Sequence, residues 1–330
     1  MKRARQAPLA GVEVHAHHGV VVASPAMKKV MALLEQLAPS PLSILLIGET
    51  GTGKDILARA LHAASPRSAG PFVAISCAAL PEQLVEAELF GYERGAFTGA
   101  VGARPGLLET ASGGTAFLDE IGELPLPQQG KLLRALEAGE IFRIGARKPT
   151  RINVRFVAAT NRDLALEADR GNFRSDLYYR LAGMKIAIPP LRERPEDILP
   201  LTRHFAARAA EMMGRPPPVF SKAALTRLER HPFPGNIREL RNVVERAVAL
   251  AGPNPIEPEH LHLELPPTGI SSRAHRATEG TERHRIVDAL VRCGGNQTRA
   301  AALLGISRRT LVNRLVEYGI PRPRRKRRPN

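Results

Sequence analysis

A chain of 330 residues exceeds the usual size of one compact domain, so its length predicts two or three structural units. Hydrophobic residues make up 43% of the chain but aromatic residues only 4%, with no Trp, so the core must be mainly aliphatic. Two isolated cysteines, Cys77 and Cys293, exclude a disulfide scaffold and a zinc ribbon and suit the reducing cytosol. No apolar run is long enough to predict a membrane span, so we expect no membrane partner.

The positive charge is concentrated at the carboxyl-terminal end. The formal net charge is +16, and residues 268–330 contain 15 Lys and Arg against 4 Asp and Glu, a net of +11. The preceding residues therefore carry only +5. Because strongly basic segments favour polyanionic partners, this end of the chain is the candidate nucleic-acid module.

Residues 1–18 predict a disordered, solvated leader. The apolar stretch that follows, Gly19–Ala23, is too short for a signal peptide. A metal site at His15, His17 and His18 is the alternative for this segment, and we favour the solvated leader.

Residues 19–190 show the pattern of an α/β domain. Short apolar segments alternate with helical or loop segments, which favours a parallel sheet with helices on both faces. The predicted strands are Leu42–Ile47, Phe72–Ile75, Thr115–Leu118 and Val154–Ala158.

Residues 191–265 show helical spacing only and predict a small all-helical subdomain. Its predicted helices are Glu196–Met213, Ser221–His231 and Asn236–Ala251, with start signals at Ser221 and at the Pro-Gly-Asn turn before the last helix. Residues 266–281 are rich in turn formers and predict a flexible linker. Helical patterning resumes at residue 282 and ends in a basic tail.

A glycine-rich motif follows the first predicted strand. The segment GETGTGKD fits the P-loop pattern except at its end, where Asp55 replaces the usual Ser or Thr ligand of magnesium. Glycines let the backbone approach closely, so that its N–H groups surround phosphates while Lys54 reaches the outer phosphate oxygens. We therefore predict an ATP site with Mg²⁺ as cofactor. The predicted ATP-binding residues are Gly48, Glu49, Thr50, Gly51, Thr52, Gly53, Lys54 and Asp55.

Two carboxylates, Asp119 and Glu120, end the apolar strand that begins at Thr115. Phosphoryl transfer needs positioning and charge neutralisation, so we predict that Asp119 holds magnesium through water and that Glu120 polarises the attacking water. An isolated acidic pair at a strand end is equally well explained as a solvated surface. The preceding P-loop favours the catalytic interpretation.

The segment GAFTGA at Gly95–Ala100, with its flanks ELFGYER and GGTAFLDEIGELP, resembles the signature of the sigma-54-dependent enhancer-binding proteins. These are the NtrC-like branch of the AAA+ ATPases, and the resemblance covers essentially the whole chain from about residue 19. Glycines on both sides predict a mobile loop whose exposed Phe needs a partner surface. The resemblance implies that this loop contacts sigma-54 through Gly95, Ala96, Phe97, Thr98, Gly99 and Ala100.

The resemblance also implies roles for four further residues. Asn161 matches the polar sensor at the end of a core strand, and Arg238 matches the second sensor in the helical lid. Arg174 and Arg180 match the pair that reaches into a neighbouring subunit's ATP site. Arginine suits such roles because its guanidinium stays charged and binds phosphate bidentately.

Two positions depart from general patterns. Asp55 is an acid after Lys54, but this branch commonly carries one there, so it does not predict an inactive site. Ser76 stands where the family usually has an Asn that bonds the catalytic Glu. Because Ser is shorter and offers one donor, the coupling of hydrolysis to the orientation of Glu120 is in question.

The segment Asn296–Gly319 resembles a Fis-type helix-turn-helix. Its predicted inward-facing residues are Ala300, Ala301, Leu303, Leu304, Leu311, Leu315 and Val316, with the turn at Gly305 and a helix cap at Ser307. The residues predicted to bind DNA on the outer face are Arg308, Arg309, Thr310, Asn313 and Arg314. Helical spacing at Ile286, Leu290 and Val291 suggests a dimerising helix ahead of it, and a charged helical hairpin is the alternative.

We therefore expect an α/β fold with an AAA+ P-loop core at 19–190 and a helical lid at 191–265, followed by an all-α helix-turn-helix domain at 282–330. The resemblance implies a homo-oligomer, from dimer to hexamer, that binds double-stranded enhancer DNA. It would use ATP hydrolysis to remodel the closed complex of sigma-54 RNA polymerase into the open complex.

Two other functions are open: a DNA-binding repressor with a vestigial AAA+ fold, and an AAA+ unfoldase or helicase. The intact Lys54, Asp119 and Glu120 argue against the first, and the helix-turn-helix argues against the second. Most relatives carry a regulatory domain ahead of the ATPase. The leader shows no βα pattern, so we expect none in this chain unless the natural protein begins further upstream.

Overall fold

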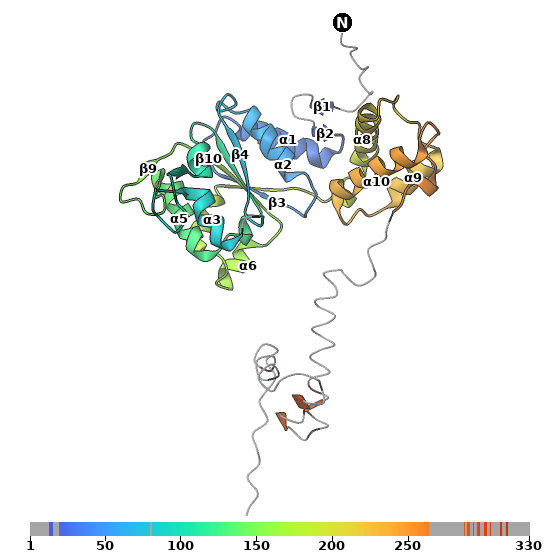
Figure 1. Cartoon of the computed structure of the whole chain (residues 1–330). Helices are drawn as coiled ribbons and strands as arrows, with labels where there is room; N and C mark the ends of the chain where they lie inside the picture. The colour runs from blue at the N-terminus through green and yellow to red at the C-terminus, as the bar shows by residue number, and fades with distance from the viewer. Residues whose placement is uncertain are drawn as a thin grey trace, which may run out of the picture. The chain divides into compact units, whose positions relative to one another are not determined.

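Among the described residues, a parallel five-stranded sheet forms the centre of the first of two units, Met1–Leu263, in the computed structural model (Figure 1). The structure describes residues 13–15, 20–79 and 81–263, and single positions between 287 and 315. The strand order is β11-β3-β10-β7-β4, with parallel pairing throughout, as predicted. The strands are β3 Ile44–Ile47, β4 Phe72–Ser76, β7 Thr115–Asp119, β10 Arg155–Thr160 and β11 Met184–Ala187.

The central strand β10 is buried along its whole length, as expected for a strand covered on both faces. Its first residue, Arg155, is buried as well and donates hydrogen bonds to the carbonyl oxygens of Ala38 and Leu37 at the end of helix α1. The strand extends two residues beyond the predicted end at Ala158. The edge strand β11 was not predicted, because its four residues, MKIA, carry no clear alternation.

Helices cover both faces of the sheet, as the sequence pattern predicted. One face packs against α1 Pro25–Leu37 and α2 Lys54–Ala63 through Ile44, Leu46 and Val157. The other face carries the intervening side chains, such as Leu45 and Phe156. It is covered by α3 Glu82–Phe90, α4 Leu107–Thr110, α5 Leu126–Ala138, α6 Leu164–Asp169 and α7 Ser175–Leu181. Alternate side chains of one strand therefore pack into two separate hydrophobic cores, one on each face of the sheet.

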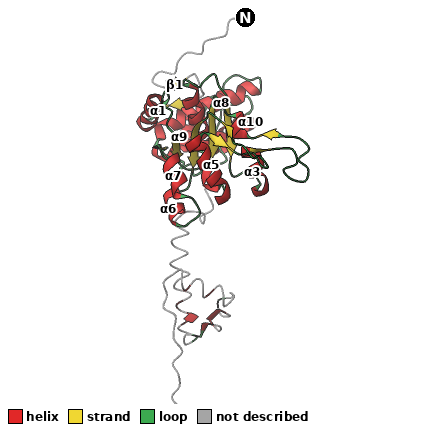
Figure 2. Ribbon diagram, turned by 90° about the vertical axis from the view of Figure 1, so that its left-hand side faces the viewer, coloured by secondary structure: helices red, strands yellow, loops and turns green. Residues whose placement is uncertain are grey.

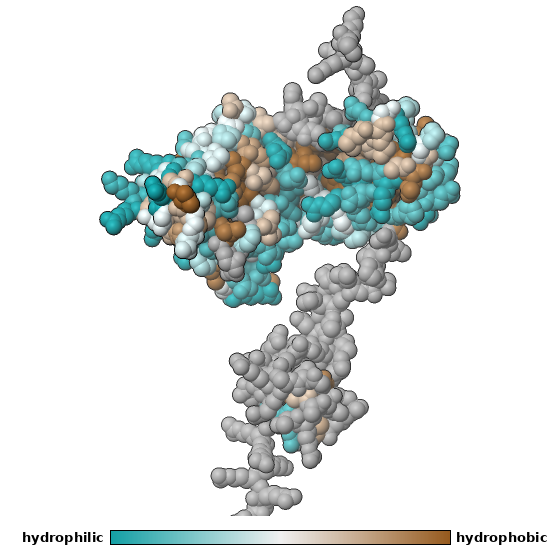
Figure 3. All heavy atoms as spheres, in the orientation of Figure 1, coloured by the Kyte–Doolittle hydropathy of each residue, from teal (hydrophilic) through white to brown (hydrophobic). Residues whose placement is uncertain are grey.

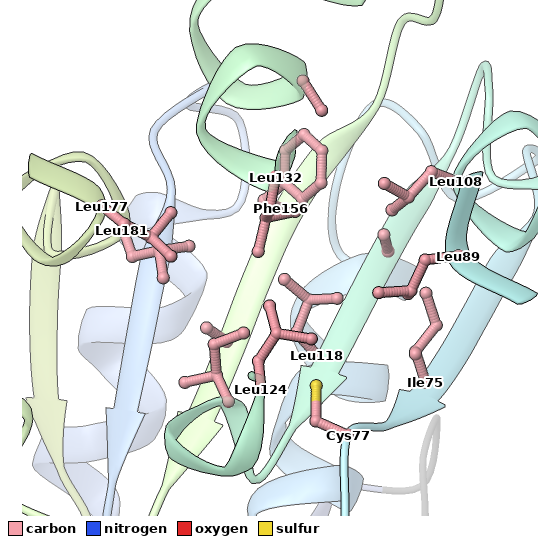
Figure 4. Packing of buried hydrophobic residues seen from close by; sticks show 14 of the residues in the cluster. Ile75, Cys77, Leu89, Leu108, Leu118, Leu124, Leu132, Phe156, Leu177 and Leu181 are labelled. Carbon is pink, nitrogen blue, oxygen red and sulfur yellow. The ribbon is translucent and has the colours of Figure 1, made fainter. Parts of the chain in front are cut away.

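The second of these cores is seen in Figure 4. Leu118 and Phe156 point from neighbouring strands toward side chains of the covering helices, among them Leu89 and Leu132. The close packing of this hydrophobic layer holds β7 and β10 in place. It therefore also fixes the positions of the polar residues that follow these two strands.

A helical subdomain follows the sheet, as predicted. It contains α8 Ile198–Met212, α9 Lys222–Arg230 and α10 Asn236–Ala251, with short 3-10 turns η2 Leu191–Glu193, η3 Pro195–Asp197 and η4 Pro258–His260. Ser221 caps α9 by accepting a hydrogen bond from the Ala224 N–H. The helix α8 begins two residues later than predicted, because Pro195–Asp197 forms a 3-10 turn.

Three two-stranded antiparallel pairs complete the described part of this unit. They are β1 Glu13–His15 with β2 Val20–Val22, β5 Gly91–Tyr92 with β6 Arg104–Pro105, and β8 Glu140–Ile141 with β9 Thr150–Arg151. The strand β1 lies inside the segment for which a disordered leader was predicted. None of the described helices combines the length and apolar character that a bilayer crossing requires.

The second unit, Glu264–Asn330, has a small hydrophobic core of its own. Its buried residues are Ala289, Leu290, Ala300, Ala301, Leu311 and Leu315, with Leu304 packed against them. The predicted burial of Ala300, Ala301, Leu311 and Leu315 is thus confirmed. Leu303, Val316, Ile286 and Val291 lie outside the described residues.

Candidate functional site

The P-loop joins β3 to α2 at the carboxyl edge of the sheet, where its conformation requires glycine. Gly51 and Gly53 have φ angles of 80° and 95°, in the left-handed region that L side chains rarely adopt. A Cβ at Gly51 would also lie 2.3 Å from the carbonyl oxygen of Gly235 in the helical subdomain. The loop is therefore shaped both by its own backbone and by the subdomain packed on it.

Lys54, the first residue of α2, is buried, and its ammonium group is held inside the loop. Its Nζ donates hydrogen bonds to the carbonyl oxygens of Gly48 at 2.7 Å and Glu49 at 3.0 Å. Burial lowers the pKa of Lys54, and the charges of Asp119 and Glu120 oppose that change. A lysine at a helix N-terminus, surrounded by backbone N–H groups, is a site for phosphate.

Asp119 and Glu120 lie at the end of β7, facing this cation. Burial raises the pKa of Asp119, the nearby Glu120 carboxylate raises it further, and Lys54 lowers it. Glu120 has a left-handed backbone, with φ 53°, and its N–H donates to Asp119 Oδ1 at 3.1 Å. Within the described part of the chain, no three His, Cys, Asp or Glu residues could hold a metal ion.

Asn161 directly follows β10 and reaches the P-loop, where its Nδ2 donates to Thr50 Oγ1 at 3.1 Å. Ser76 ends β4 opposite Asp119 in the sheet register. No hydrogen bond joins the Ser76 hydroxyl to Glu120 among those of the described residues, so Ser76 does not hold Glu120 in this structure.

The helical subdomain docks directly on the P-loop. The carbonyl oxygen of Gly51 accepts hydrogen bonds from the N–H groups of Ile237 at 2.9 Å and Arg238 at 3.3 Å. This places the backbone of Arg238 at the loop while its side chain is exposed. The subdomain therefore brings an additional arginine to the edge of the phosphate site.

A second set of contacts, all hydrogen bonds, holds the carboxylate of Glu49 in the P-loop. Arg192 forms two hydrogen bonds with its carboxylate, at 2.8 and 2.6 Å, and Asn236 Nδ2 donates a third at 3.1 Å. The bond from Arg192 lowers the pKa of Glu49, so the carboxylate stays charged. Sequence reasoning missed both partners, since Asn236 was seen only as a helix start and Arg192 had no motif.

An apolar cavity lies behind the P-loop. It is lined by residues from β2, α1, the P-loop, α2, α8 and α10, together with one arginine: Val20, Val21, Met27, Thr52, Gly53, Ile56, Leu57, Arg194, Leu201, Phe205 and Ile237. Its position beside the phosphate site suits the ring system of a nucleotide. Sequence reasoning had no signal for this cavity, because its walls come from several segments that are far apart in the chain.

Arg174 and Arg180 lie at the two ends of α7 and take their partners from α7 and α5. Both are exposed. Arg174 forms two hydrogen bonds with Asp176, at 3.0 and 2.7 Å, and Arg180 donates to the Leu136 carbonyl oxygen at 3.2 Å. The structure thus does not bring these arginines to the P-loop contacts of their own chain.

The GAFTGA loop, Gly95–Ala100, lies between β5 and β6 and follows α3 in the chain. In Figure 2, loops extend outward beyond α3. Gly95 and Gly99 have φ angles of 80° and 103°. Thr98 is exposed, and Phe97 is 45% exposed with its ring against the edge of Tyr92, at a centroid distance of 5.0 Å. The predicted exposure of the loop tip is confirmed.

A neighbouring hairpin, residues 140–151, supports the base of this loop. The Ile144 N–H donates to the Gly91 carbonyl oxygen at 2.9 Å, and the Glu93 N–H donates to Ile144 at 3.0 Å. Arg143 pairs with both Glu93 and Glu109. Three large hydrophobic side chains are exposed here: Phe97 in the loop, Val101 just after it and Phe142 in the hairpin. Figure 3 shows hydrophobic and hydrophilic residues intermixed on this face of the first unit. Sequence reasoning did not identify this hairpin.

The five residues predicted to contact DNA, Arg308, Arg309, Thr310, Asn313 and Arg314, lie outside the described residues. What the structure describes nearby is the core that would carry them, built from Ala300, Ala301, Leu311 and Leu315.

Three family profiles match consecutive parts of the chain. The Sigma-54 interaction domain matches residues 20–187, the AAA+ ATPase lid domain matches residues 192–278, and the bacterial regulatory protein, Fis family, matches residues 279–318. Together they account for the sheet, the helical subdomain and the second unit.

Individual relatives agree with these profiles. The sigma54-dependent transcriptional activator SfnR of Pseudomonas putida is 44% identical over 321 residues, which cover 91% of this chain and 88% of that protein. The transcriptional regulatory protein ZraR of Klebsiella oxytoca is 46% identical over 305 residues, covering 91% and 69%. Crystallised NtrX from Brucella abortus in complex with ATP superposes with a TM-score of 0.69 at 33% identity, covering 91% of this chain and 70% of that one. The chain therefore belongs to the sigma-54-dependent transcriptional activators, with an AAA+ core, a helical lid and a Fis-type helix-turn-helix.

Proposed function

We propose that this activator hydrolyses ATP with Mg²⁺ and uses the cycle to convert closed complexes of sigma-54 RNA polymerase into open complexes. The observation that carries the proposal is the meeting of Lys54, Asp119 and Asn161 at one sheet edge. Lys54 lies close enough to Asp119 for their charges to shift each other's pKa, and Asn161 hydrogen-bonds the P-loop. A cation, a carboxylate and a polar sensor at one edge are the parts that phosphoryl transfer requires.

Each residue of this edge has a distinct role in the proposal. The backbone of Gly48–Asp55 surrounds the phosphates, and Lys54 exchanges its carbonyl partners for phosphate oxygens. Asp119 would hold Mg²⁺, and the ion would neutralise charge on the transferring phosphoryl group. Glu120 accepts a proton from the attacking water, and Asn161 and Arg238 report on the outer phosphate. The base occupies the apolar cavity behind the P-loop.

Arg174 and Arg180 act in this proposal on the ATP of an adjacent subunit. Both are exposed and lie at the two ends of α7, and their partners are Asp176 and the Leu136 carbonyl oxygen of α5 rather than the P-loop. A positive charge supplied from a neighbour makes hydrolysis depend on assembly. We therefore propose a homo-oligomeric ring that grows from dimer to hexamer.

The output of the cycle passes through the GAFTGA loop to sigma-54. Opening about ten base-pair steps costs on the order of 14 kcal/mol at about 1.4 kcal/mol per step, which binding alone cannot readily supply. The exposed Phe97 and Thr98 carry no role in the phosphate chemistry, so they are free to contact a partner. Arg308, Arg309, Thr310, Asn313 and Arg314 of the helix-turn-helix bind the enhancer.

The proposal is tested by open-complex formation in vitro with purified full-length chain, sigma-54 polymerase and a supercoiled promoter. We expect open complexes with ATP but not with ADP or with the Lys54→Ala variant. A control reaction on a sigma-70 promoter should show no dependence on the chain. Open complexes formed at the same rate by the Lys54→Ala variant would refute a role for the P-loop.

A further inference from the structure

Gln129 of α5 is a polar side chain that is completely buried, with 0% of its surface exposed. Its Nε2 donates hydrogen bonds to the carbonyl oxygens of Leu124 at 2.7 Å and Asn172 at 3.3 Å. Its Oε1 accepts a hydrogen bond from the Arg174 N–H at 2.8 Å. Burying an amide is costly unless such partners are present. Gln129 therefore joins α5 to the turn after β7 and to the loop before α7.

The turn that Gln129 holds directly follows the proposed catalytic carboxylate, Glu120. It is a 3-10 turn, η1 Ile121–Glu123, whose last N–H donates to the Glu120 carbonyl oxygen at 2.9 Å. The next residue, Leu124, is buried, and its side chain packs into the core (Figure 4). Because the turn is held by its own hydrogen bond and by the core, it is a fixed point to which Gln129 can tie other segments.

The same amide fixes the backbone of Arg174, although the guanidinium of this arginine is exposed. The preceding residue, Phe173, is buried in the core, and the Arg174 N–H donates to Gln129. The guanidinium lies beside the next residue of α5, where a Cβ built on Gly130 would be 3.8 Å from Arg174 Nη1. Arg174 therefore starts from a fixed backbone position and carries its charge past α5 to the surface.

We propose that Gln129 is the positioning residue for Arg174, and that it aims this arginine at the ATP of an adjacent subunit by tying it to the turn after Glu120. This inference rests on the proposed function, in which Arg174 acts across the subunit interface. Reacting groups must be held in a precise geometry, and a residue on a loop gains that precision from a rigid support. The arginine that a subunit offers its neighbour and the carboxylate that it uses itself thus share one support.

The first test is the Gln129→Met substitution in the full chain. Met keeps the approximate size and the helical preference of the side chain but removes all three hydrogen bonds. We expect kcat for ATP hydrolysis to fall about 10- to 100-fold, because a misplaced catalytic group costs that much, while KM changes by less than about twofold. A variant with the wild-type kcat, or one that neither binds ATP nor assembles, overturns the proposal.

Gln128→Met is the matched control for this substitution. Gln128 is the preceding residue of α5 and is also buried, but its Oε1 has no hydrogen-bond partner in the described part of the chain. The control variant should therefore hydrolyse ATP like the wild type. An equal loss of turnover in both variants would mean that α5 tolerates no apolar replacement here, and the specific role of Gln129 would be refuted.

Mixed rings then locate the defect in the neighbouring site. A Gln129→Met subunit keeps its own P-loop, so it should regain turnover when it receives the correctly held arginine of a Lys54→Ala subunit. Lys54→Ala subunits that also carry Arg174→Ala should give no gain. No gain with the first partner, or an equal gain with both, means that the variant does not lack a positioned Arg174, and the proposal fails. If the Arg174→Ala variant alone hydrolyses ATP at the wild-type rate, the proposed function across the interface fails instead.

Discussion

At the scale of single residues, backbone strain gathers around the phosphate site. Among the described residues, three non-glycine positions have a positive φ: Glu120, Phe233 and Asn236. Such conformations cost about 1–3 kcal/mol each and persist only where surrounding contacts enforce them. Glu120 directly follows Asp119, and Asn236 bonds Glu49 of the P-loop, with Phe233 in the same turn. The strained positions thus lie at the end of β7 and where the helical lid meets the P-loop.

The Glu120→Gln substitution tests the proposed role of that carboxylate. The amide keeps the size of the side chain but accepts a proton poorly, so we expect ATP binding to persist while hydrolysis falls about 100-fold or more. Steady-state phosphate release and nucleotide binding measure the two effects separately. Lys54→Ala is the matched control, because it should lose binding as well. Substantial turnover by the Gln variant would show that another group activates the water.

The structure brings together the predicted site residues whose motifs are local in sequence. The P-loop, Asp119, Glu120 and Asn161 each follow a predicted strand, and parallel strands bring their carboxyl ends to one edge. Contacts between segments that are far apart in the chain leave no recognisable pattern in the sequence. Glu49 meets Arg192 across 143 positions, and Asp197 meets Ser24 across 173, so neither pair was predicted.

At the scale of elements, the GAFTGA loop combines an exposed tip with a fixed base. Gly95 and Gly99 carry the left-handed conformations of the tip, and open space surrounds both. The base is tied by backbone hydrogen bonds to Ile144 and by the pairing of Arg143 with Glu93 and Glu109. The neighbouring hairpin therefore fixes the base of the loop.

Substitutions at the loop tip should separate hydrolysis from its output. We expect Phe97→Ala or Thr98→Ala to retain the ATPase rate within about twofold, because neither side chain reaches the phosphate site, and to abolish open-complex formation. Val101→Ala is the matched control: Val101 is 85% exposed just outside the loop, and its loss should leave both activities unchanged. Either tip variant forming open complexes at the parental rate would contradict the assignment.

Element prediction was accurate for buried periodic segments and weaker at boundaries. Helix α10 was predicted with the observed bounds, since its apolar stripe and its start signal agree. The strand β11 was missed because four residues at a sheet edge, only one of them buried, leave no periodic pattern. The hairpin at 140–151 was missed for the same reason, as its strands are two residues each.

At the scale of the whole molecule, Arg174 and Arg180 should make hydrolysis a property of the assembly. We expect rings of the Arg174→Ala variant to hydrolyse ATP poorly, although their P-loops are intact. Mixed with Lys54→Ala subunits, whose arginines are intact, they should regain turnover, measured as phosphate release against mixing ratio. Lys54→Ala subunits that also lack Arg174 and Arg180 are the control and should not rescue. No gain at any ratio would argue that the arginines act within their own subunit or not at all.

The division into two units predicts that hydrolysis and DNA recognition can be separated. The boundary between the two units in the chain falls between Leu263 and Glu264, and each unit has its own hydrophobic core. The excess of basic residues lies in residues 268–330. A chain ending at Leu263 should therefore retain ATPase activity at concentrations that permit assembly, but lose specific enhancer binding. The full chain should bind enhancer DNA with an affinity that falls steeply with salt, because each neutralised phosphate contributes a slope of about −0.9 in a plot of log K against log salt concentration.

Band-shift or anisotropy titrations from low to high salt measure this slope, and the Lys54→Ala full chain is the control for an effect of hydrolysis on binding. That control should bind DNA like the wild type, since the P-loop belongs to the other unit. Specific binding retained by the shortened chain, or binding by the full chain that does not respond to salt, would place DNA recognition outside the basic unit.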